Sequence, residues 1–127
     1  VEVVMTEQPA GLEHLGRNIE VNRIAGVPCE RVSAAALDWS DCAGEGLVGT
    51  EWDLVIGSDL LYAEQAVRDL PALFGRLAGP RTRVLYAHTL HRYDHLDVEF
   101  FKELQAIGLE CHEVGDLPRE DPEEFLQ

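Results

Sequence analysis

The stretch EWDLVIGSDLLYAEQ (residues 51–65) joins a continuous apolar run to two polar residues that follow it closely. The run over 52–58 shows no alternation of apolar and polar residues, which is typical of a strand covered on both faces. Asp59 comes directly after this run and Tyr62 three residues later. Because an unpaired buried charge is costly, Asp59 belongs where the strand opens onto solvent or a partner. The stretch therefore predicts an inner strand that ends at a polar edge.

The segments on either side alternate between the patterns of strands and helices. Pro71 interrupts the second predicted helix, while Asp97 as N-cap and Gly108 as C-terminal stop bound the third. This order predicts an α/β, Rossmann-like fold whose mainly parallel sheet carries helices on both faces and binds ligands beyond the carboxyl ends of its strands. The predicted strands are 1–6, 30–39, 52–58, 83–88 and 109–114, the predicted helices are 9–23, 64–78 and 96–108, and a loop is predicted over 40–50.

Length and charge restrict the class of protein. A chain of 127 residues predicts a single domain, 1–127, with an acidic tail over 115–127. Because Val1 already lies in a strand-like run, we expect the chain to be a piece of a longer protein. The net charge of −14 opposes binding to nucleic acid and suits a cationic partner, such as a lysine-bearing protein segment, although acidic surfaces also serve solubility alone. No run reaches the roughly 20 apolar residues that a membrane span needs.

Cysteine and histidine spacing predicts neither a disulfide framework nor a metal site. Three cysteines without paired spacing predict free thiols and an intracellular protein, cytoplasmic in the first place and nuclear as the alternative. His88 and His91 supply two ligands without a convincing third, so we interpret them as residues of the ligand crevice or a loop.

Acids and an aromatic residue follow the first two predicted strands. Glu7 has the chemistry to accept hydrogen bonds from a ribose diol, or simply to favour the N-terminus of the following helix through its dipole. Trp39 offers a face for an adenine ring, with Asp38 beside it as an acceptor for the amino group. The alternative is that Trp39 belongs to the core.

Asp59 and Tyr62 follow the third predicted strand and are three residues apart, so both side chains can face the same side. Together they could hold an amine, Asp59 by charge and Tyr62 by a hydrogen bond and its aromatic wall. The alternative is that Asp59 caps the following helix and that Tyr62 packs beneath it.

Four segments in order give the chain a resemblance to a known family: VVMTEQPAGLEHLGRNIEVN, LDWSD, DLVIGSDLLY and FFKELQAIGLECHEV. They resemble class I, seven-β-strand, S-adenosylmethionine-dependent methyltransferases, and within them the protein lysine methyltransferases with an Asp-x-x-Tyr motif. The resemblance implies S-adenosylmethionine as cofactor, a protein substrate with an exposed lysine, and transfer by in-line displacement without a metal.

The resemblance also implies residue roles. Glu7, although the family usually has Asp there, matches the acid that binds the ribose hydroxyls, and Trp39 matches the aromatic residue beside the adenine. Ser58 stands next to the cofactor, where the family often has Ala. Asp59 and Tyr62 match the Asp-x-x-Tyr motif at the substrate lysine.

Other parts of the family pattern are less complete. Arg92 resembles an arginine often found after the strand at 83–88, with a less defined role. The family's first strand with its glycine-rich turn, and its last strand, are not found in the chain. The first strand would lie between the strands at 1–6 and 52–58, so its absence should leave two halves of a sheet with unpaired edges and exposed apolar surface. We therefore expect this segment alone to be inactive or poorly folded.

Two other functions remain open from the sequence. One is a methyltransferase of the same fold that acts on a histidine side chain or a small molecule. The other is a non-catalytic binding module that keeps the fold and lacks the activity.

Overall fold

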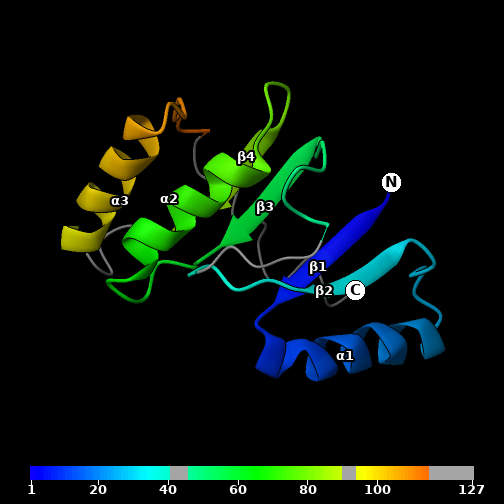
Figure 1. The fold of residues 1–127 in the computed structure, drawn as a ribbon. Coiled ribbons are helices and arrows are strands. Elements are labelled where there is room, and N and C mark those ends of the chain that lie inside the picture. Colours follow the sequence, from blue (N-terminus) through cyan, green and yellow to red (C-terminus); the bar gives the residue numbers. More distant parts are fainter. Residues whose placement is uncertain (41–45, 90–93, 115–127) are drawn as a thin grey trace, which may run out of the picture.

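The computed structural model describes residues 1–40, 46–89 and 94–114 (Figure 1). The predicted alternation of strand and helix is confirmed through the third helix, with boundaries that shift by a few residues. The elements are β1 (Val3–Glu7), the short 3₁₀ helix η1 (Pro9–Gly11), α1 (Leu12–Ile24), β2 (Val32–Ala36), β3 (Leu54–Ser58), α2 (Ala66–Leu77), β4 (Arg83–Ala87) and α3 (Asp94–Ala106).

The strands form two separate parallel pairs. β1 pairs with β2, from Val3 opposite Val32 to Glu7 opposite Ala36, and β3 pairs with β4, from Leu54 opposite Arg83 to Ser58 opposite Ala87. No hydrogen-bonded ladder joins the pairs within the residues that the structure describes. The fold is thus mixed α/β and partly Rossmann-like, with the two unjoined halves expected for a sheet that lacks its shared strand.

Apolar side chains on the strands remain at the surface where the halves face one another or lack a cover. Ile56 of β3 is 69% exposed and Met5 of β1 is 43% exposed. An apolar cavity of about 130 Å³ lies between the pairs, with Val4 on the β1 side and Val55 on the β3 side. These exposed positions agree with the expected loss of a covering partner.

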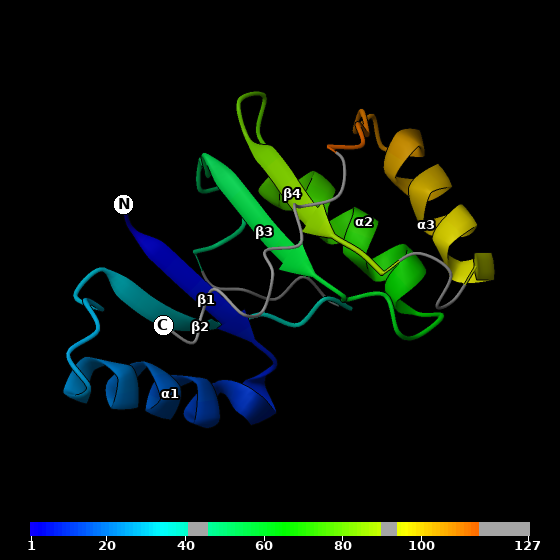
Figure 2. The same cartoon turned by 180° about the vertical axis from the view of Figure 1, so that it is seen from behind.

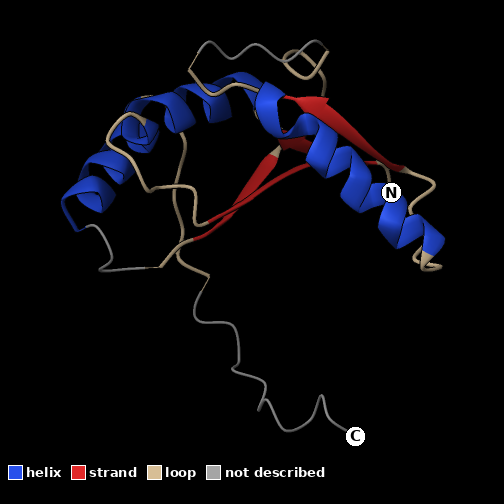
Figure 3. Ribbon diagram, turned by 90° about the horizontal axis from the view of Figure 1, so that it is seen from below, coloured by secondary structure: helices blue, strands red, loops and turns tan. Residues whose placement is uncertain are grey.

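The helices divide between the two halves, as Figure 2 shows from behind. α1 lies along β1 and β2, whereas α2 lies between α3 and the β3–β4 pair. Figure 3 shows the same separation from below, with α1 at one end of the molecule. Within the described part of the chain, no helix is long and apolar enough to cross a membrane.

The main core surrounds α2. Leu70 and Phe100 are completely buried, and Val55, Val84 and Tyr86 of the strands pack against their cluster. α2 continues through Pro71, so the predicted interruption is not a break. Its buried face holds Ala66, Val67, Leu70, Pro71, Leu73, Phe74 and Leu77.

Two predictions on the last elements are wrong. Residues 109–114 form no strand, because none of the described strands lies beside them to complete a ladder. Asp97 is not an N-cap, because α3 begins three residues earlier, at Asp94. Gly108 does end the helix as predicted: its φ of 86° lets the Leu109 N–H donate to the Leu104 carbonyl oxygen at 3.1 Å.

Candidate functional site

The candidate site residues lie at the carboxyl ends of β1, β2 and β3. Glu7 ends β1, while Asp38 and Trp39 follow β2. The Leu37 N–H donates to the Glu7 carbonyl oxygen at 2.8 Å, which extends the pairing just past the end of β2. This bond keeps the end of β1 beside Leu37, the residue that precedes Asp38 and Trp39.

Glu7 turns its side chain back over the start of the next helix. The Gln8 N–H donates to Glu7 Oε1 at 2.8 Å, and a Cβ added to Gly11 would lie only 2.6 Å from Glu7 Cγ. A residue larger than glycine at position 11 would therefore displace the Glu7 side chain. The hydrogen bond from the Gln8 N–H supports the interpretation that Glu7 favours the start of the following helix. The Glu7 side chain is also exposed, so a ligand can reach it.

Asp38 is held ionised by its neighbour. The Ser40 Oγ–H and N–H donate to Asp38 Oδ1 at 2.7 and 3.0 Å, and these two hydrogen bonds lower the pKa of Asp38, the hydroxyl bond most. Trp39 is half-buried and packs against both hydrophobic clusters of the molecule. The core interpretation of Trp39 thus holds for part of its ring, while the rest stays accessible.

Asp59 stands where the chain leaves β3. Its φ of 52° lies in the left-handed region, which Asp tolerates better than most residues. Its N–H donates to the Ala87 carbonyl oxygen at 2.9 Å, one residue beyond the register pair of Ser58 and Ala87. Both Ser58 and Asp59 are exposed, so the chain turns at the carboxyl edge with its polar side chains toward solvent.

Tyr62 meets Trp39 across the two halves. Their ring centroids are 6.1 Å apart with planes at 54°, and Tyr62 is 58% exposed. Tyr62 is therefore not packed beneath α2, contrary to the alternative interpretation. The structure brings together the aromatic residue predicted for the cofactor and the one predicted for the substrate.

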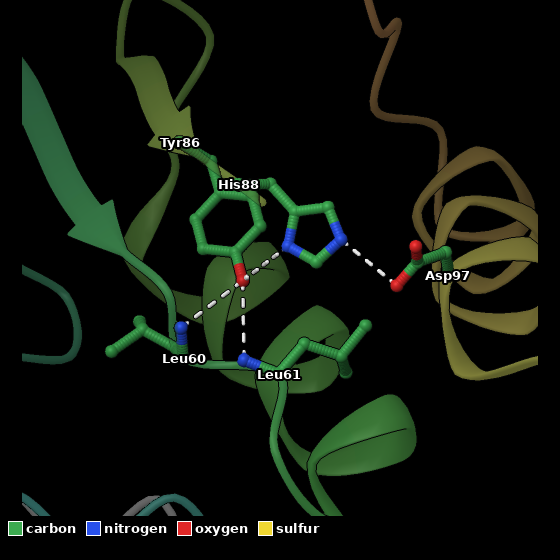
Figure 4. A network of polar contacts seen from close by, with 5 residues as sticks. All are labelled: Leu60, Leu61, Tyr86, His88 and Asp97. Atoms are coloured by element: carbon green, nitrogen blue, oxygen red, sulfur yellow. Dashed lines mark hydrogen bonds and ion pairs between the residues drawn. The ribbon is translucent and has the colours of Figure 1, made fainter. Parts of the chain in front are cut away.

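A polar network behind the segment 59–62 was not predicted from the sequence. Tyr86 Oη accepts hydrogen bonds from the N–H groups of Leu60 and Leu61, at 3.2 Å each (Figure 4). His88 Nδ1 lies 3.5 Å from the same oxygen, and His88 Nε2 lies 2.8 Å from Asp97 Oδ1. Nothing in the sequence marks this set, because its members come from three separate elements.

Burial keeps the Tyr86 phenol protonated. It is the largest cause that raises the pKa of Tyr86, the charges of Asp59 and Asp97 add to it, and the two backbone hydrogen bonds oppose it. His88, predicted as a residue of the crevice or a loop, lies in the loop after β4 and turns inward, with its side chain only 7% exposed beside Asp97. The described residues hold no group of three potential metal ligands, and His91 and Arg92 lie outside them.

Comparison with known proteins places the chain in a family. A sequence model described as lysine methyltransferase matches residues 1–107, most of the chain. The chain belongs to the lysine methyltransferase family. The match covers both halves of the molecule, including every candidate site residue between Glu7 and Tyr62.

The chain is also similar to a curated relative. It is 28% identical over 102 residues to protein N-lysine methyltransferase METTL21A of Xenopus tropicalis. The match covers 80% of the chain and 46% of the relative, so the chain spans less than half of that protein. The resemblance to protein lysine methyltransferases is thereby confirmed, while the Asp-x-x-Tyr motif and the roles of the individual site residues stay predictions.

Proposed function

We propose that the native protein containing these residues transfers a methyl group from S-adenosylmethionine to a lysine side chain of a protein. The family match supports the reaction class, and the relative's name supports a protein lysine as the acceptor. The observation that carries the proposal is the approach of Tyr62 to Trp39 at the carboxyl edge. This edge is where ligands bind in open α/β folds.

The donor set of the N-terminal half suits the cofactor. Glu7 supplies a carboxylate for a ribose diol, Trp39 a half-buried ring for adenine, and Asp38 an ionised acceptor beside it. Ser58, exposed at the end of β3, would border the cofactor from the other half. When bound, the cofactor supplies an activated methyl group on a sulfonium centre.

Asp59 and Tyr62 would act on the lysine amine. Asp59 places a carboxylate beside it, and Tyr62 offers a phenol and an aromatic face. A carboxylate near an ammonium raises the pKa of that ammonium, which opposes its deprotonation. We therefore assign Asp59 to positioning the neutral amine and to stabilising the positive charge that develops on nitrogen, with alignment as the main contribution of the protein.

The partner that fits this site is a protein segment with an exposed lysine. The net charge of −14 attracts such a cationic segment and disfavours nucleic acid. Of the described cysteines, Cys29 is a buried free thiol and Cys111 an exposed one. Free thiols suit an intracellular setting, cytoplasmic or nuclear.

Mass spectrometry of methylated substrates tests the proposal. The native protein and S-adenosylmethionine should add methyl groups to lysine residues of an intracellular protein extract. Asp59→Ala should lower the rate of methyl transfer by about 100-fold or more, because a misplaced lysine nitrogen reacts more slowly by a factor of that size. Asp53→Ala is the matched control, because it removes an exposed acid just before the other end of β3 and should keep the rate.

Three results would contradict the proposal. Methyl groups found on histidine, or only on a small molecule, would reject lysine as the acceptor. Unchanged turnover of Asp59→Ala would reject its role at the amine. The absence of any transfer, together with retained binding of a protein partner, would favour the non-catalytic binding module.

A further inference from the structure

The backbone of the Asp59–Tyr62 segment is hydrogen-bonded mainly to β4 and not to α2, the helix that follows it. The Asp59 N–H donates to the Ala87 carbonyl oxygen at 2.9 Å. The N–H groups of Leu60 and Leu61 both donate to Tyr86 Oη. Only the fourth, the Tyr62 N–H, bonds within the segment, to the Leu60 carbonyl oxygen at 3.2 Å. Two of these four amides therefore depend on one phenol oxygen.

The direction of each hydrogen bond around that phenol follows from its neighbours. With the Oη lone pairs accepting from two amides, the phenol proton needs an acceptor, and His88 Nδ1 at 3.5 Å is placed to receive it. A carboxylate oxygen accepts, so the 2.8 Å contact between Nε2 and Asp97 Oδ1 favours the tautomer with the ring proton on Nε2. In that tautomer Nδ1 is an acceptor. A single chain of bonds runs from Asp97 to the Leu60–Leu61 backbone.

Ring packing restricts where the phenol can move. Tyr86 stacks on His88 with centroids 5.6 Å apart, and it lies against Phe100 at 5.4 Å and Phe74 at 6.3 Å. Phe100 is fully buried in the core, so the ring of Tyr86 is fixed from α2 and α3. The side chain of Asp97 is 11% exposed, so the far end of the chain of bonds is shielded from water as well.

We propose that Tyr86, oriented by His88 and Asp97, is a positioning residue that sets the place of Asp59 and Tyr62 at the substrate amine. This inference rests on the proposed function, which assigns the amine to Asp59 and Tyr62. Tyr86 is half-buried behind the segment and is hydrogen-bonded to it through the backbone N–H groups of Leu60 and Leu61. The cofactor residues Glu7, Asp38 and Trp39 lie at the ends of strands of the other pair, and none of the four contacts in this chain of bonds involves them.

The test compares Tyr86→Phe with Thr82→Val in the native protein. Tyr86→Phe removes one oxygen, its two hydrogen bonds to the segment and its contact with His88 Nδ1. Thr82→Val likewise removes a half-buried hydroxyl with two hydrogen bonds, to the Gly79 N–H and the Trp52 carbonyl oxygen, near the opposite end of β4. We expect Tyr86→Phe to lower kcat about tenfold to 100-fold with little change in the KM for S-adenosylmethionine, because loose positioning costs factors of this size. Thr82→Val should leave both constants near those of the wild type.

Amide hydrogen exchange gives a second readout that needs no activity. In Tyr86→Phe the amides of Leu60 and Leu61 should exchange faster, while the Asp59 amide, bound to Ala87, should keep its rate. Asp97→Ala should speed exchange at the same two amides, and Asp97→Asn should restore part of the protection because its amide oxygen can still accept from Nε2. The comparison of Asp97→Ala with Asp97→Asn tests the positioning role of Tyr86 even where Tyr86→Phe does not fold.

The outcomes separate this inference from the proposed function. Unchanged exchange at Leu60 and Leu61, or a fall in kcat no larger than that of Thr82→Val, would overturn the positioning role. A wild-type protein without transfer to lysine would instead overturn the proposed function, and with it the reaction that Tyr86 is assigned to serve, whatever the exchange data show.

Discussion

The two halves of the molecule differ in how well they are packed. In the half built from β3, α2, β4 and α3, α2 buries seven residues and the core contains the fully buried Leu70 and Phe100. In the half built from β1, α1 and β2, α1 buries only Ile19. Ile24 at the end of that helix is 77% exposed. Packing strength is therefore concentrated in the half that carries Asp59 and Tyr62.

This difference corresponds to a division of the proposed chemistry. The well-packed half would position the amine, where errors in alignment are costly. The loosely packed half carries Glu7, Asp38 and Trp39, which would bind a cofactor. Trp39 belongs to both halves of the molecule, since it packs against both hydrophobic clusters and contacts Tyr62. We interpret Trp39 as the main link between the two functions.

The largest effect should follow from removing the central ring of the well-packed half. Phe100→Ala should lower the free energy of unfolding by about 3–5 kcal/mol, as expected for a fully buried aromatic side chain. Ile19→Ala should cost about 2 kcal/mol, the low end for its type, because the surroundings of α1 are open. Urea unfolding of the two variants measures both values. Equal losses would contradict the difference in packing between the halves.

A pair of glycine substitutions should have opposite signs in the two halves. A Cβ on Gly57 would lie 2.9 Å from Leu60 Cδ1 and 3.3 Å from Tyr86 Cδ2, so Gly57→Ala should destabilise by about 1–3 kcal/mol through overpacking. Gly16 lies inside α1 with nothing within 4 Å of an added Cβ. Gly16→Ala should therefore stabilise by about 0.5–1 kcal/mol. Thermal unfolding gives both signs, and a stabilising Gly57→Ala would refute the close approach of Leu60 and Tyr86.

The smallest effect concerns the charge beside Trp39. Ser40→Ala removes the hydroxyl that most lowers the pKa of Asp38, so this pKa should rise toward its ordinary value. A carboxyl group whose pKa is lower in the native state than in the unfolded state stabilises the fold at pH values above the unfolded-state pKa. This stabilisation is lost as the pH falls through the native-state pKa. Ser40→Ala should therefore reduce the pH dependence of stability in this acidic range. An NMR titration of the Asp38 carboxyl checks the shift, and an unmoved pKa would contradict the role of Ser40.

The order of elements could be predicted because each segment carries its own pattern. The apolar run over 52–58 and the periodic spacing of Val67, Leu70, Phe74 and Leu77 report local structure directly. The strand predicted at 109–114 failed because a strand exists only with a ladder partner, and apolar alternation does not supply one.

The site could be predicted only in part for the same reason. The position of Glu7, Trp39, Asp59 and Tyr62 could be predicted because the carboxyl ends of parallel strands meet at one edge, whereas their roles stay predictions. The network of Tyr86, His88 and Asp97 includes contacts between residues far apart in the sequence, nine positions for His88 and Asp97 and 26 for Tyr86 and Leu60. Asp97 looked like a helix cap because an acid near a helix start favours that position, whereas its burial against His88 becomes visible only in three dimensions.

We propose that the half built on β1 and β2 makes most of the cofactor contacts, with Ser58 of β3 beside them, and that Asp59 and Tyr62 hold the amine. Isothermal titration of S-adenosylmethionine into the native protein and two variants tests it most directly. We predict that Glu7→Gln, which removes the ribose-binding charge, weakens binding about tenfold, the size of one charge-assisted hydrogen bond. Asp59→Ala should leave the Kd within about threefold of the wild type while abolishing methyl transfer. Loss of cofactor binding in Asp59→Ala, with Glu7→Gln unaffected, would contradict the claim.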